Sequence, residues 1–130
     1  MEFKDKQSIY LQIADYVCEQ LLLGKWPASE RIPSVRDLAV TLEVNPNTVM
    51  RTYDFLQGKN ILFNKRGIGY FAAEEATARI LEYRKERFLE SELPEFFRTL
   101  YLLNISIEEL EQRYKSFVTA AYPTTDNFKR

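Results

Sequence analysis

The feature that most constrains this chain is the stretch from Pro33 to Tyr53, which predicts two short helices joined by one tight turn. Ser34 can accept hydrogen bonds from backbone amides of the first turn, so it suits the start of the first helix. That helix must end near Val44, because the next residue, Asn45, precedes a proline and is disfavoured in helical geometry. Asn45 then caps the second helix, with Pro46 in the first position, where no amide donor is needed.

The side chains of this stretch divide between an apolar and a polar face. The first turn of the second helix presents Asn47, Thr48 and Arg51 outward. Two helices around a short turn, with polar residues at this place, suit insertion into the major groove of DNA. An ordinary αα-hairpin whose polar residues only face water fits the same stretch, which by itself does not decide between the two. The apolar side chains that recur at helical spacing are Leu38, Ala39, Leu42, Val49, Tyr53 and Leu56.

A basic hairpin is predicted directly after the second helix. Residues 61–64 and 69–72 have the composition of short strands, and the connection between them contains Lys65, Arg66 and Gly67. Such a hairpin is common as a solvated turn. Its place after this helix pair favours a wing, which contacts phosphates or reaches the minor groove.

Composition argues against an enzyme. The chain has 130 residues, a formal net charge of −1, one cysteine and no histidine, so the residues for histidine acid–base chemistry, Cys/His zinc sites and disulfides are missing. Residues 1–72 carry 9 basic and 8 acidic residues, a net charge of +1, which is at least the sign that DNA requires. Glu108, Glu109 and Glu111 lie on a helix predicted to be solvated, with no nucleophile–base pair in view. We expect no catalytic residues, no metal and no cofactor.

The beginning of the chain predicts a helix over residues 8–23, with apolar residues at helical spacing. It shows neither the pattern of a signal peptide nor a run of membrane-spanning length. The sequence therefore predicts a cytoplasmic protein with no membrane partner.

Four blocks of this sequence resemble the GntR family of bacterial transcriptional regulators, in family order and at family spacing. The short tail and the third block resemble most the YtrA-like subfamily. The blocks are SIYLQI at 8–13, IPSVRDLA at 32–39, VNPNTV at 44–49 and RGIGYF at 66–71.

The resemblance implies roles for particular residues. Arg36 would contact DNA from the helix before the recognition helix, Asn45, Asn47 and Thr48 would meet bases and phosphates, and Gly67 would be the wing glycine. Physically, an arginine suits phosphate or a guanine edge, and an asparagine suits adenine. The full predicted DNA-binding set is Ser34, Arg36, Asn45, Asn47, Thr48, Arg51, Lys65, Arg66 and Gly67.

Three positions depart from the family pattern. Glu43 stands in the helix–turn–helix turn where the family usually has glycine. Asn60 replaces another glycine, although asparagine tolerates the same positive φ. Ile68 lies between the wing glycines, where a basic or polar residue is frequent.

Residues 74–122 predict two or three amphipathic helices rich in aromatic residues, and Ser106 begins the last of them as a capping residue. About fifty residues are too few to bury so many aromatic side chains alone, so the helices must pack on the winged domain or on a second copy. A dimer is favoured over packing on the winged domain, and a ligand pocket lined by the aromatic side chains is a further, less favoured alternative. The predicted dimerisation residues are Leu81, Phe88, Phe96, Phe97, Leu100, Leu103 and Tyr114.

The sequence thus predicts a mainly α fold with a small β wing. Residues 1–73 form a winged helix-turn-helix DNA-binding domain, residues 74–122 a helical dimerisation domain, and residues 123–130 a polar tail. The predicted function is sequence-specific transcriptional regulation, as a repressor that binds a pseudo-palindromic operator in double-stranded DNA as a homodimer. The alternative is a winged-helix protein-interaction module without specific DNA binding. A small-molecule effector is a possible further partner that no feature of the sequence supports.

Overall fold

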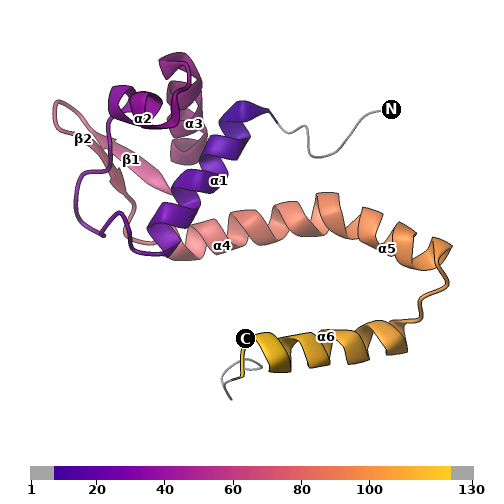
Figure 1. Ribbon diagram of the computed structural model, residues 1–130. Coiled ribbons are helices and arrows are strands. Elements are labelled where there is room, and N and C mark those ends of the chain that lie inside the picture. The colour runs from indigo at the N-terminus through magenta and orange to yellow at the C-terminus, as the bar shows by residue number, and fades with distance from the viewer. Residues whose placement is uncertain (1–7, 124–130) are drawn as a thin grey trace. The chain divides into compact units, whose positions relative to one another are not determined.

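The computed structural model describes residues 8–123 and divides the chain into two compact units, residues 1–85 and residues 86–130. Figure 1 shows helices throughout and one small hairpin, which confirms the predicted mainly α fold with a β wing. The elements in chain order are α1 (Ile9–Leu22), α2 (Val35–Leu42), α3 (Pro46–Gly58), β1 (Leu62–Lys65), β2 (Gly69–Ala72), α4 (Ala76–Arg87), a π-helical turn η1 (Phe88–Glu92), α5 (Leu93–Leu102) and α6 (Ile107–Ala121).

The two helices of the central stretch begin where their capping residues predict. The Asp37 amide donates to Ser34 Oγ at 3.0 Å, and the Asn47 amide donates to Asn45 Oδ1 at 2.7 Å. Pro46 occupies the first turn of α3, where its missing N–H costs nothing. Between the helices, Glu43 takes the left-handed conformation with φ 57° and ψ 49°. The turn therefore keeps the glycine-like geometry although its side chain is a glutamate.

The core of the first unit forms around one face of α3. Val49, Tyr53 and Leu56 are fully buried, and they pack with side chains of α1, α2 and the first residues of the hairpin. The Tyr53 hydroxyl donates to the Pro33 carbonyl at 2.7 Å, which ties α3 to the segment that begins α2. The remaining buried apolar side chains of this cluster are Ile13, Ala14, Val17, Cys18, Ile32, Leu38, Ala39, Ile61, Leu62, Ala76, Ile80 and Tyr83.

A buried hydroxyl joins α1 to α3. Thr52 is fully buried, and its Oγ1 lies 2.7 Å from the Tyr10 carbonyl and 3.2 Å from the Thr48 carbonyl, so its proton is shared between two acceptors. This bond fixes the first turn of α1 beside the middle of α3.

The hairpin is antiparallel and short. Its strands pair from Leu62 with Ala72 to Lys65 with Gly69, so β1 begins one residue later than predicted and includes Lys65. Asn60 has φ 63°, as the tolerance of asparagine for this region predicts. The name "the wing" is used below for this hairpin, residues 62–72.

The second unit is a set of helices with little buried surface of its own. Within residues 86–123, the buried side chains are Leu100 on α5 and Val118 on α6. The Glu109 amide donates to Ser106 Oγ at 3.1 Å, which confirms Ser106 as the residue that caps α6.

The predicted domain limits remain predictions. By packing, α4 as far as Lys85 belongs to the first unit, and Ile80 and Tyr83 of this helix lie in its core. The predicted polar tail of residues 123–130 lies, apart from Pro123, outside the described residues.

We predict that Tyr53→Phe lowers the free energy of unfolding by about 1–2 kcal/mol, because the substitution removes a buried hydrogen bond and leaves the Pro33 carbonyl without its donor. Burial also raises the pKa of the Tyr53 phenol, so the hydroxyl stays protonated and able to donate. Urea denaturation followed by circular dichroism measures the change. Tyr101→Phe is the control, because Tyr101 is 82% exposed. Equal stability of Tyr53→Phe and the unsubstituted chain would contradict this account.

Candidate nucleic-acid interface

The first two turns of α3 carry the polar side chains that the sequence predicts for base contact. Asn47 and Arg51 are exposed and Thr48 is half-buried, on the side of the helix opposite the buried residues Val49 and Tyr53. The helix is therefore held in the core by one face and presents donors and acceptors on the other. This is the geometry that a recognition helix requires.

The Arg51 side chain lies against an aromatic ring of α1. Its guanidinium carbon lies 4.0 Å from the centroid of the Tyr10 ring, close enough for a cation–π interaction. The Tyr10 ring in turn packs edge-on against Phe55 at 5.8 Å between centroids. No role for Tyr10 at this site was predicted from the sequence. The sequence feature that could have pointed to Tyr10 is its position in SIYLQI, the first of the four blocks that resemble the GntR family.

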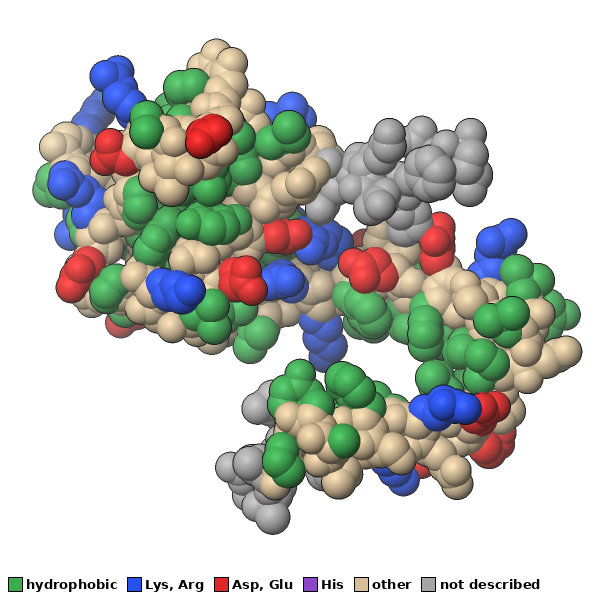
Figure 2. All heavy atoms as spheres, in the orientation of Figure 1, with side chains coloured by type: hydrophobic (Ala, Val, Ile, Leu, Met, Phe, Trp, Pro, Cys, Tyr) green, Lys and Arg blue, Asp and Glu red, His purple; other side chains and the backbone are tan. Residues whose placement is uncertain are grey.

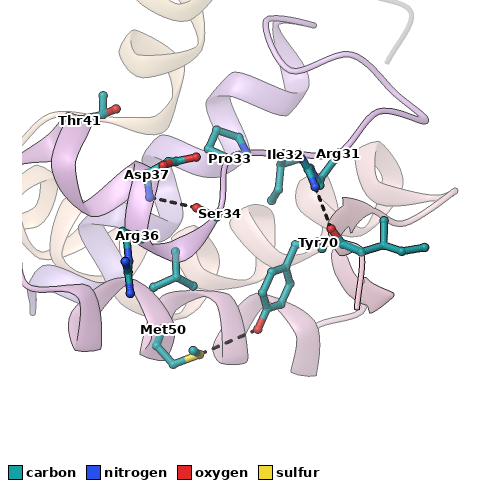
Figure 3. A pocket seen from close by; sticks show the side chains of 12 residues that line it. Arg31, Ile32, Pro33, Ser34, Arg36, Asp37, Thr41, Met50 and Tyr70 are labelled. Carbon is teal, nitrogen blue, oxygen red and sulfur yellow. Dashed lines mark hydrogen bonds between the residues drawn. The ribbon is translucent and has the colours of Figure 1, made fainter. Parts of the chain in front are cut away.

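A groove lies beside α3, between the start of α2 and the wing. Its volume is about 970 Å³, and Figure 3 shows Ser34, Arg36 and Asp37 on its α2 side, and Met50 and Tyr70 across it. The exposed Arg36 thus shares one open groove with residues of α3 and the wing.

Eight of the nine predicted DNA-binding residues, all but Asn45, fall into three groups of the first unit. Ser34 and Arg36 line the groove, and Asn47, Thr48 and Arg51 line a shallower hollow of about 370 Å³ together with residues 8–10. The third group is the turn of the wing, where Lys65, Arg66 and Gly67 are all exposed and Gly67 has φ 79°.

Two residues of the predicted DNA-binding set already accept hydrogen bonds within the chain. The oxygens of Ser34 and Asn45 accept the backbone amides that cap α2 and α3. Their acceptor role is therefore first a structural one, although the Ser34 hydroxyl keeps a proton that can be donated.

The predicted dimerisation residues are exposed, with one exception. Leu100 is only 7% exposed and packs within its own chain. Figure 2 shows hydrophobic side chains gathered on the helices of the second unit. The exposed members of the predicted set are Leu81, Phe88, Phe96, Phe97, Leu103 and Tyr114.

Comparison with known proteins identifies the family. The family model described as "Bacterial regulatory proteins, gntR family" matches residues 9–71, which contain α1, the helix pair and most of the wing. YhcF of Bacillus subtilis, an HTH-type transcriptional regulator, is 34% identical over 116 residues, which cover 89% of this chain and 94% of YhcF. The chain belongs to the GntR family.

Two further relatives agree with this assignment, and the first of them, YtrA, also agrees with the YtrA-like subfamily. The HTH-type transcriptional repressor YtrA of Bacillus subtilis is 30% identical, over 82% of each chain. A crystal structure assigned to the GntR family, from Bacteroides thetaiotaomicron, is 51% identical with a TM-score of 0.77, and the match covers 86% of this chain and 98% of that one. The helix pair described above is therefore the DNA-binding helix-turn-helix of a transcriptional regulator.

Neither a candidate metal site nor a candidate membrane span is found in the part of the chain that the structure describes. Among residues 8–123 there is no cluster of three His, Cys, Asp or Glu side chains that could hold a metal ion. No helix in this range is long and apolar enough to cross a membrane.

We predict that Glu43→Gly raises the free energy of unfolding by about 0.5–1 kcal/mol, because glycine adopts the left-handed conformation of this turn without the steric cost that a side chain brings. Thermal and urea unfolding measure the change. Glu111→Gly is the matched control: Glu111 lies inside α6, where glycine is expected to lower stability by about 1 kcal/mol. A loss of stability in Glu43→Gly would show that this residue is not strained.

Proposed function

We propose that this GntR-family chain is a repressor that binds a pseudo-palindromic DNA operator as a homodimer. The observation that carries the DNA part is the placement of three polar groups around one helix. The start of α3 lies between two hollows, the groove lined by Arg36 and the shallower hollow lined by Arg51. The cationic wing adjoins the groove lined by Arg36. The repressor part is supported by the similarity to YtrA, which is named as a transcriptional repressor.

In this proposal α3 enters the major groove and the wing contacts the backbone beside it. Asn47 is suited to an adenine edge, and Arg51, held by Tyr10, to a guanine or a phosphate. Arg36, Lys65 and Arg66 are suited to phosphates, which would set the register of the protein on the duplex.

The dimer is supported by the second unit. Its helices expose large apolar side chains and bury only two in residues 86–123, which is too small a core for a stable unit. A second copy would cover these faces, and its two-fold symmetry would place two recognition helices on half-sites about one helical turn, roughly 34 Å, or a multiple of it apart.

We predict that genomic fragments selected on the purified protein contain a pseudo-palindrome, and that its affinity falls steeply as salt rises, because binding releases counterions. Fluorescence anisotropy across a salt series measures this. Arg36→Ala is expected to weaken binding about tenfold, the worth of one charged contact. Lys59→Ala is the control, because Lys59 follows the far end of α3 and lies over the rings of Phe55 and Tyr83.

Enrichment no better than random DNA, or affinity that does not depend on salt, would contradict the proposal. The second result would favour the protein-interaction module that the sequence left open.

We predict that Phe97→Asp shifts the chain from dimer to monomer at micromolar concentration, because the charge would be placed in an apolar contact between copies. Sedimentation velocity measures the assembly. Leu23→Asp is the matched control, since Leu23 is 61% exposed but lies in the first unit. A chain that sediments as a monomer before any substitution would contradict the dimer.

A further inference from the structure

The segment before α2 is attached to the wing by its backbone. Arg31 forms a bridge with Phe71 of β2, and the Ile32 amide donates to the Tyr70 carbonyl at 2.9 Å. Ile32 is buried, so this junction is anchored in the core of the first unit. The segment thus adds a short third partner to a two-stranded hairpin.

The side chain of Arg31 extends this attachment to the turn of the wing. Its Nη1 donates to the Ile68 carbonyl at 3.0 Å, as the dashed line in Figure 3 shows. Its aliphatic part crosses Gly69, where an added Cβ would lie 2.5 Å from Arg31 Cδ and 3.0 Å from Cγ. Gly69 also has φ 145°, a conformation that side chains rarely adopt. Gly69 is therefore the residue that lets Arg31 lie against the wing.

This contact matters because a two-stranded hairpin alone is only marginally stable in water. The strands of the wing have four residues each, and the side chains of its turn are exposed. The Arg31 bond holds a carbonyl only two residues beyond Arg66, at the point where the chain turns into β2.

We propose that Arg31 is a positioning residue that holds the turn of the wing in place and thereby presents Lys65 and Arg66 to DNA. The inference rests on the proposed function, because it assigns to Arg31 an effect on DNA affinity that acts through the wing. It gives Arg31 a role different from a direct phosphate contact, for which an exposed arginine beside the groove is also chemically suited.

A double-mutant cycle separates the two roles. Arg31→Ala is expected to weaken operator binding about five- to tenfold, the worth of one hydrogen bond that orders a binding element. In a Lys65→Ala/Arg66→Ala background the same substitution is expected to change affinity less than about twofold, because the residues that it positions are gone. Arg31→Lys keeps a donor of similar reach and is expected to restore most of the affinity. Lys25→Ala is the charge-matched control: it follows the far end of α1, which is roughly 20 Å long.

Amide hydrogen exchange gives a readout that does not need DNA. The Ile68 amide donates to the Lys65 carbonyl at 2.8 Å across the turn, so its exchange reports how often the turn opens. Arg31→Ala is expected to speed this exchange, while Arg31→Lys and Lys25→Ala leave it unchanged.

Equal losses of affinity from Arg31→Ala in both backgrounds, or unchanged exchange at Ile68, would overturn the proposal. Failure of the unsubstituted protein to bind any selected DNA would instead refute the proposed function, and the exchange measurement would still decide whether Arg31 holds the wing.

Discussion

The burial of one face of α3 determines how the other elements of the first unit are arranged. Val49 and Leu56 each contribute about 1.5–3 kcal/mol by leaving water, and Tyr53 between them is fully buried with its hydroxyl bonded to Pro33. Because successive faces of a helix are set by its period, burying this face obliges Asn47 and Arg51 to point outward. The same packing that stabilises the unit therefore also orients its recognition surface.

The polar contacts of α3 extend this constraint to neighbouring elements. Thr52 ties the start of α1 to α3 through the Tyr10 carbonyl, and the ring of the same tyrosine lies under Arg51. At the other side, Tyr53 reaches Pro33, directly beside the segment that pairs with the wing. Helix, wing and the start of α2 are thus connected through single, well-defined bonds. A substitution in one of these elements is therefore expected to change the stability of the others.

Most of the first unit could be predicted from the sequence because its signals are local. Capping by Ser34 and Asn45, the proline at the start of α3, and the positive φ of Asn60 all depend on residues a few positions apart. The contacts that could not be predicted join residues distant in the chain. Nothing near Arg31 in the sequence indicates that its side chain crosses Gly69, 38 residues later. Nothing near Arg51 indicates that Tyr10 lies beneath it.

The sequence also predicts the helices of the second unit better than it predicts their contacts. Its apolar periodicity predicted helices correctly, but periodicity does not say which apolar side chains pack within a chain and which between chains. Leu100 belonged to the predicted dimerisation set by its spacing, yet it is buried within its own chain. Phe96 and Phe97 remain exposed and keep their place in the proposed contact.

In the proposed complex, the exposed face of α3, the groove lined by Arg36 and the wing form one surface for DNA. Titration of the isotope-labelled full chain with its selected operator, followed by amide chemical shifts, tests this most directly. We expect the largest shifts at residues 34–36, 45–51 and 65–68, with smaller changes elsewhere in the first unit. Shifts confined to the second unit, with these three segments unmoved, would contradict the account.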